Sequence, residues 1–99
     1  MPRLLTDDEI ATQLQGLENW QRADSDGDPA ISTSFELADF RAALDLVQRI
    51  GDAAEQMDHH PDIDIRWNKV VLVLSTHSEG GLTQLDIEAA HRFNDEAGL

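Results

Sequence analysis

The stretch Trp67-Asn68-Lys69-Val70-Val71-Leu72-Val73-Leu74-Ser75-Thr76 decides the fold of this chain. Its run of branched apolar residues predicts a β-strand, because such side chains pack well on a pleated surface. Side chains alternate along a strand, so Val70, Leu72 and Leu74 point to one face of the sheet and the intervening valines point to the other. Both faces of this strand are therefore apolar. A shorter, weaker strand is expected just before it, from Asp62 to Arg66.

The longest helix is expected ahead of this pair of strands. Apolar residues recur there at steps of three and four, which is the spacing of one face of an amphipathic helix. Gly51 costs about 1 kcal/mol relative to alanine and does not end the helix. Pro61 does end it, because proline pushes the preceding His60 out of the helical region. The positions predicted to face the core are Leu37, Phe40, Leu44, Val47, Ile50, Ala54 and Met57.

Two further helices are predicted from a shared local sequence. Leu5-Thr6-Asp7-Asp8-Glu9-Ile10 and Leu82-Thr83-Gln84-Leu85-Asp86-Ile87 both place an acid three residues after a threonine. In such a capping box the threonine hydroxyl accepts from the backbone amide of the acid, and the acid accepts from the backbone amide of the threonine. We expect one helix from about Thr6 to Leu17 and another from about Thr83 to Asn94.

A β-hairpin is predicted between the first helix and the long helix. Residues 18–22 and 30–35 read as strands on either side of the turn-rich segment 24–29. The order of elements is then helix, strand, strand, helix, strand, strand, helix. This order is typical of a two-layer α+β domain, with a four-stranded antiparallel sheet and three helices on one face. The hairpin residues predicted to face the core are Ile31, Thr33 and Phe35.

The second apolar face of the strong strand has a consequence for assembly. Three helices can cover one face of the sheet, and the valines on the other face then need a different partner. We expect another subunit to cover that face or the edge of the sheet. The sequence therefore predicts a homo-oligomer.

The composition restricts the class of protein. The chain has 99 residues, 20 acidic and 7 basic, with a net charge of −13, which fits one domain over residues 1–99. So few basic residues argue against nucleic-acid binding, which relies on lysine and arginine at phosphates. The absence of cysteine excludes disulfides, thiolate zinc sites and cysteine nucleophiles. Without a stretch that could form a membrane span or a signal sequence, a soluble cytoplasmic protein is expected.

An acidic turn in the predicted hairpin has the alternating carboxylates of a calcium loop. Those carboxylates belong to Asp24, Asp26 and Asp28. An EF-hand needs glycine and glutamate at two positions that are Pro29 and Phe35 in this chain. We therefore interpret the segment as a solvated hairpin tip.

The candidate functional residues are three histidines at the ends of predicted elements. His59 and His60 end the long helix just before Pro61, and His77 follows the strong strand. A helix end with a proline turn lets neighbouring side chains project toward one cavity, and His77 joins them if the strand ends beside the helix. Imidazoles titrate near neutral pH, so this group could supply both a proton donor and a proton acceptor.

Two other interpretations of these histidines stay open. His59 and His60 could cap the long helix and interact with its dipole. With His77 they could instead bind a catalytic zinc ion, although adjacent histidines seldom present convergent lone pairs and the usual helical spacing is absent. His91 lies on the last predicted helix and is expected to be a surface residue without a role.

Four segments around the histidines form one pattern. They are Asp58-His59-His60-Pro61, Trp67-Asn68-Lys69-Val70, Leu74-Ser75-Thr76-His77, and Gly81-Leu82-Thr83 followed by Asp86. In this order and spacing they resemble the pterin-4a-carbinolamine dehydratases, also called 4a-hydroxytetrahydrobiopterin dehydratases. The resemblance spans about Phe35 to Phe93. The chain departs from some members at Asp62-Ile63-Asp64-Ile65, where they carry an aromatic residue.

The resemblance implies a fold, a reaction and a set of site residues. The fold is a four-stranded antiparallel sheet with helices on one side, assembled into dimers or tetramers. The reaction removes water from the 4a-hydroxytetrahydropterin left by aromatic amino acid hydroxylases and gives quinonoid dihydropterin, with no metal and no cofactor. By position, the residues implied are catalytic His59, His60 and His77, with Glu55, Pro61 and Asp86 as substrate-binding or supporting groups.

The resemblance also leaves a second function open. The same fold serves as a dimerisation partner in animals and as a Rubisco assembly factor in some bacteria, so a non-enzymatic binding or assembly factor is the alternative. The complete histidine set favours the enzyme, because a protein freed from catalysis has no physical need for three imidazoles at those positions.

Overall fold

The chain folds into one sheet covered by helices, and the computed structural model describes residues 2–99. Its helices and strands are α1 (Asp7–Leu14), β1 (Gln21–Ser25), β2 (Asp28–Glu36), α2 (Phe40–Met57), β3 (Asp62–Arg66), β4 (Lys69–Leu74) and α3 (Gln84–Glu96), with the short 3-10 helix η1 (His77–Glu79) before α3. None of the helices in residues 2–99 is long and apolar enough to cross a membrane.

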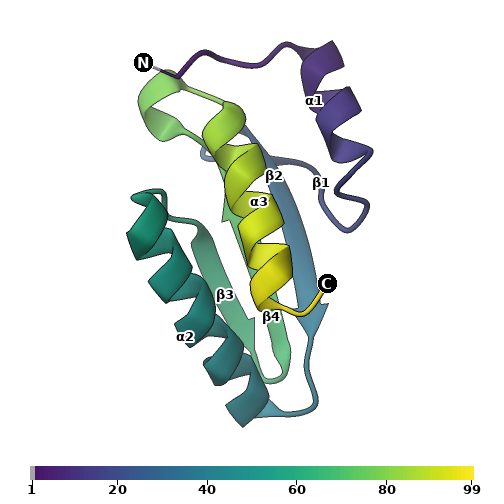
Figure 1. Cartoon of the computed structure of the whole chain (residues 1–99), viewed down its shortest axis with the longest axis vertical. Coiled ribbons are helices and arrows are strands. Elements are labelled where there is room, and N and C mark those ends of the chain that lie inside the picture. Colours follow the sequence, from purple (N-terminus) through teal and green to yellow (C-terminus); the bar gives the residue numbers. More distant parts are fainter. Residues whose placement is uncertain (1) are drawn as a thin grey trace.

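The sheet has the order β1-β2-β4-β3, and each neighbouring pair is antiparallel. Figure 1 shows α2 and α3 side by side against one face, while α1 lies next to β1. An ion pair between Arg22 of β1 and Asp7 of α1, with 3.4 Å between Nη1 and Oδ1, joins those two elements. The predicted α+β class, with a four-stranded antiparallel sheet and three helices, is confirmed.

The core lies between β4 and the helices. Val70, Leu72 and Leu74 of β4 are completely buried, as the alternation of this strand predicted. Leu46 of α2 and Phe93 of α3 are equally buried and belong to the same cluster. Burial of such side chains is the main stabilising contribution in a domain of this size.

The buried face of α2 differs in part from the predicted one. Phe40 and Leu44 are 48% and 37% exposed, so their assignment to the core was wrong. The helix instead buries a stripe that is displaced around its axis and rich in alanine. Small side chains let α2 approach α3 and the sheet closely, and helical periodicity does not by itself choose between two apolar stripes. The residues of the buried stripe are Ala43, Leu46, Ile50, Ala53 and Ala54.

The hairpin is also displaced along the chain. Its turn is the two-residue pair Asp26-Gly27, with positive φ angles of 51° and 91°. Aspartate followed by glycine suits such a turn, because both residues tolerate the left-handed region that matches the twist of the strands. The strands therefore run to Ser25 and from Asp28, and most of the predicted loop is paired. The first helix correspondingly ends at Leu14, earlier than predicted.

The face of the sheet that the helices leave open is mostly polar. Val71 of β4 is half-buried there, and its partners across the sheet are Ser34 on β2 and Asp64 on β3. Val73 is likewise flanked by Ser32 and by an aspartate. The strand is apolar on both faces as predicted, but its neighbours interrupt the apolar area on the open face.

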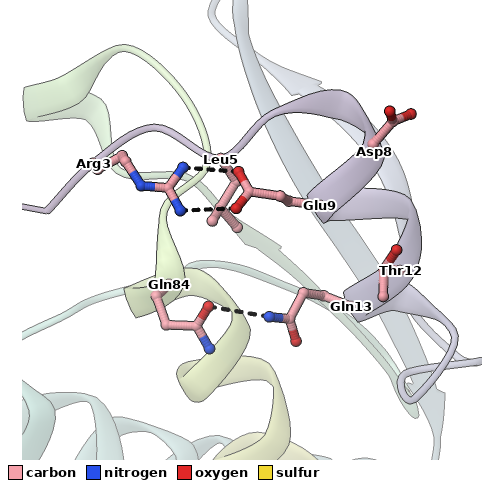
Figure 2. Close-up of a pocket in the computed structure, with 7 residues that line it drawn as sticks. All are labelled: Arg3, Leu5, Asp8, Glu9, Thr12, Gln13 and Gln84. Atoms are coloured by element: carbon pink, nitrogen blue, oxygen red, sulfur yellow. Dashed lines mark hydrogen bonds and ion pairs between the residues drawn. The ribbon is translucent and has the colours of Figure 1, made fainter.

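The N-terminal arm, residues 2–6, ties α1 to the start of α3. The backbone amide of Leu5 donates to the carbonyl of Leu82 over 2.8 Å. The guanidinium of Arg3 donates two hydrogen bonds of 2.8 Å to the carboxylate of Glu9. Figure 2 shows this pair above the bond from Gln13 to Gln84, around a cavity of about 420 Å³. Four of the polar side chains that line this cavity are paired, Arg3 with Glu9 and Gln13 with Gln84, so we interpret it as a joint between the arm, α1 and α3.

This arm predicts a pH-dependent contribution to stability. The hydrogen bonds from Arg3, and then that from the Thr6 amide, lower the pKa of Glu9 from 4.5 to about 2. A carboxyl whose pKa is lower in the folded chain than in the unfolded chain stabilises the fold at any pH above its unfolded pKa. This stabilisation disappears as the pH falls from about 4.5 to about 2. Glu9→Gln keeps a capping side chain but loses the charge. We expect its Tm to lie below that of the wild type at pH 7, with a gap that closes toward pH 2. A gap that is constant over this range would contradict the prediction.

Candidate active site

The end of α2 sends two adjacent histidines in different directions. Asp58 has a φ of 51°, in the left-handed region that commonly ends a helix. The amide of His59 then donates back to the carbonyl of Ala54 over 3.1 Å. As a result His59 is buried, with 9% of its surface exposed, whereas the side chain of His60 is 53% exposed. The sequence placed both histidines correctly at the helix end, but only His59 enters the interior.

His59 is bound to a buried carboxylate. Its Nε2 lies 2.7 Å from Oδ1 of Asp86, which is completely inaccessible to solvent. A carboxylate can only accept, so the hydrogen of His59 is on Nε2 and a neutral ring carries its lone pair on Nδ1. The pair fixes both the orientation and the tautomer of this imidazole.

Asp86 also holds the start of α3. Its Oδ2 accepts from the amide of Thr83 over 2.9 Å and from the hydroxyl of Thr76 over 2.8 Å. The hydroxyls of Thr76 and Thr83 lie 2.8 Å apart, and since Thr76 donates to Asp86, Thr83 must donate to Thr76. The predicted capping box is present, and the same carboxylate serves as cap and as the partner of His59.

His60 has a carboxylate partner on the surface. Its Nε2 is hydrogen-bonded to Oε2 of Glu55, which lies on the last turn of α2. The two side chains are 53% and 77% exposed, so solvent screens their attraction and a small molecule can reach both. The half-buried Pro61 follows, and β3 begins at the next residue.

His77 lies at the first position of η1, directly after the buried Thr76. Its Nδ1 is 3.3 Å from Oδ2 of Asp28 and its Nε2 is 3.5 Å from Oγ of Ser25. The Ser25 hydroxyl also lies 3.4 Å from Oδ2 of Asp62, at the start of β3. The β1–β2 hairpin therefore connects His77 to the turn that carries the other two histidines. The sequence did not predict Ser25 or Asp28 as site residues, because a turn rich in aspartate looks like an ordinary solvated hairpin tip.

The segments that carry the three histidines are linked by hydrogen bonds. Among residues 2–99, no hydrogen bond joins one imidazole to another, and each binds a different carboxylate: Asp86, Glu55 or Asp28. Within the same range, no group of three or more histidine or acidic side chains is placed to hold a metal ion. The zinc interpretation therefore has no ligand set in the described residues. Three imidazoles with separate carboxylate partners are suited to proton transfer.

Comparison with known proteins identifies the family. Residues 3–96 match the family model described as pterin 4 alpha carbinolamine dehydratase. A protein of Nocardia farcinica is 50% identical over 94 residues, covering 95% of each chain. A protein of Mycobacterium avium is 44% identical over 95 residues, covering 96% of this chain and 97% of that one. Both carry the name "Putative pterin-4-alpha-carbinolamine dehydratase".

Two solved structures share the fold. The crystal structure of a transcriptional coactivator/pterin dehydratase from Brucella melitensis is 40% identical, with a TM-score of 0.87, over 97% of this chain and all of that one. A pterin dehydratase-like protein described as a RuBisCO assembly factor in the alpha-carboxysome has a TM-score of 0.67 over 81% of this chain and 90% of that one. At 17% identity it shows a common fold alone. Because the family model spans residues 3–96 and a relative is 50% identical over 95% of the chain, this chain belongs to the pterin-4-alpha-carbinolamine dehydratase family.

Proposed function

We propose that this protein removes water from a 4a-hydroxytetrahydropterin and gives quinonoid dihydropterin, by acid/base catalysis with histidines. The observation that carries the proposal is the pairing of each of His59, His60 and His77 with its own carboxylate. A carboxylate partner orients an imidazole and stabilises its protonated form during proton transfer. The family match supports the same reaction.

The reaction needs one proton donor and one proton acceptor. A proton is added to the hydroxyl on C4a, and the C–O bond then breaks to release water. As the C–O bond breaks, the lone pair of N5 forms the double bond between N5 and C4a, and the proton on N5 is then lost to leave a neutral ring. The leaving water and the departing proton balance the equation, so the reaction needs neither a nucleophile nor a redox step.

The roles follow from exposure and hydrogen bonding. His60 and His77 have side chains that are 53% and 52% exposed, so a pterin can reach them, and we assign the proton transfers to these two. His59 is nearly buried and is paired with Asp86, so we assign it a supporting role in the interior, behind the two exposed histidines. Glu55 orients His60, and Pro61 holds the turn on which both adjacent histidines lie.

We propose a homodimer or a homotetramer as the working form. On the open face of the sheet, Val71 and Val73 are half-buried rather than covered. The outer strands β1 and β3 each have one side without a strand partner in residues 2–99, which leaves backbone groups free to pair. A second copy could cover either surface. A cytoplasmic location and a functional link to an aromatic amino acid hydroxylase belong to the same proposal.

A binding or assembly role is the second candidate. It is favoured by the Brucella protein, whose name includes a transcriptional coactivator beside a pterin dehydratase. The two candidates differ in what lies nearby in the genome: a hydroxylase gene supports pterin recycling, whereas Rubisco genes support an assembly role. They also differ in whether the histidines are needed.

The dehydration assay tests the proposed reaction. The 4a-hydroxytetrahydropterin is generated in situ, and its loss is followed by absorbance with the wild type, His60→Ala and His77→Ala. We expect each variant to lose about 10²-fold in rate, the usual size of a general acid or base contribution. His91→Ala, which removes an exposed imidazole from α3, is the matched control and keeps the wild-type rate. A wild-type rate equal to the spontaneous one, or variants equal to the wild type, would exclude histidine catalysis.

Sedimentation tests the proposed assembly. At micromolar concentration we expect a species of about two or four times the 11.0 kDa chain mass. The physical reason is the pair of half-buried valines and the free strand edges described above. A protein that sediments only as the 11.0 kDa monomer would contradict the proposal.

A further inference from the structure

The β1–β2 hairpin presents two polar side chains to His77. Ser25 ends β1 and Asp28 begins β2, and the two are directly paired across the Asp26-Gly27 turn. Residues directly opposite each other in an antiparallel pair have side chains on the same face. One hairpin end can therefore reach both nitrogens of a single imidazole, and its contacts with His77 at 3.3 and 3.5 Å do so.

His77 has little else to hold its ring. Its side chain is 52% exposed, and it belongs to a 3-10 helix of three residues. An imidazole so exposed can flip about its outer torsion, which exchanges the places of Nδ1 and Cδ2 and those of Nε2 and Cε1. Contacts at both nitrogens remove this freedom. The carboxylate of Asp28 is the stronger partner, because a hydrogen bond to a charged group is stronger than one to a neutral hydroxyl.

The chemistry of the partners also selects a tautomer. Asp28 accepts and cannot donate, so the hydrogen of the neutral ring must be on Nδ1. Nε2 then carries the lone pair and lies beside the Ser25 hydroxyl, whose single hydrogen can bond either to Nε2 or to Asp62. Asp62 directly follows the His60-Pro61 turn. The lone pair of His77 is thus on the nitrogen that lies beside Ser25, near the start of β3.

Ser25 is not placed as a nucleophile, although aspartate, histidine and serine follow one another here. Its oxygen is shared between His77 and Asp62, at 3.5 and 3.4 Å, and the residue is only 7% exposed. A nucleophilic hydroxyl would need to be accessible and to give its hydrogen to the imidazole alone. The three residues are better explained as support for the ring of His77.

We propose that Asp28 is a positioning residue, which holds His77 in the Nδ1–H tautomer and leaves the lone pair on Nε2 for proton exchange. Ser25 assists by fixing the opposite edge of the ring. That His77 exchanges a proton with the substrate rests on the proposed function, whereas the tautomer of its ring is a property of the protein alone. It can therefore be measured without any substrate.

The test is nitrogen-15 NMR of the His77 ring, at a pH where the ring is neutral. In the wild type we expect the hydrogen on Nδ1. In Asp28→Ala the ring should move mainly to the Nε2–H form, which free histidine prefers. Asp28→Asn, whose amide oxygen can still accept, should be intermediate, so the comparison survives if the alanine variant folds poorly. Asp26→Asn removes the same charge two residues away, at a positive φ that asparagine tolerates, and should behave as the wild type.

Kinetics then tests whether the tautomer of His77 matters for proton transfer. With the dehydration assay, Asp28→Ala should lower kcat by about tenfold or more and leave KM nearly unchanged, because a wrong tautomer affects proton transfer and not binding. The inference is overturned by an Nε2–H ring in the wild type, by an Asp28→Ala spectrum identical to the wild type, or by an unchanged kcat in a variant whose tautomer has switched. A wild type without dehydratase activity but with the expected spectra would instead reject the proposed function and leave the tautomer assignment standing.

Discussion

The site depends on one buried carboxylate, that of Asp86. It receives hydrogen bonds from three segments that are separate in the sequence: His59 after α2, Thr76 after β4, and Thr83 at the start of α3. A fully buried carboxylate without these donors would cost several kcal/mol, so the three segments must meet for the fold to be stable. The contacts that stabilise the end of the helix layer are therefore the same ones that position the buried histidine.

Around this carboxylate, the remaining histidines are placed by element ends. Asp58, whose backbone is in the left-handed region, ends α2, and His60 then points to the surface. The β1–β2 hairpin places Asp28 next to His77. Rigid helices and strands hold these loop side chains, while the loops leave two imidazoles open to solvent. This combination, one buried and two accessible imidazoles, suits a reaction that needs positioning, a proton donor and a proton acceptor.

Much of this arrangement could be predicted from the sequence, where local chemistry decides the outcome. Both capping boxes and the strong strand depend on residues within a few positions of one another, and α2 ends at Asp58, three residues before the Pro61 that was expected to end it. The buried face of α2 could not be predicted, because two apolar stripes share its periodicity and only packing against α3 selects one. The partners of His77 depend on contacts between residues 49 and 52 positions apart in the chain, which no local pattern shows.

The central claim is that Asp86 holds the site together through His59, and a double-mutant cycle in urea unfolding measures it most directly. Asp86→Asn replaces one accepting oxygen by an NH2 group, which cannot accept the hydrogen bonds from Thr76 and Thr83. We therefore expect the free energy of unfolding to fall by about 2 kcal/mol or more. With His59→Ala as the second change, the account predicts that the two effects are coupled by about 1 kcal/mol or more. Effects that add to within about 0.5 kcal/mol, the usual result for independent sites, would contradict it.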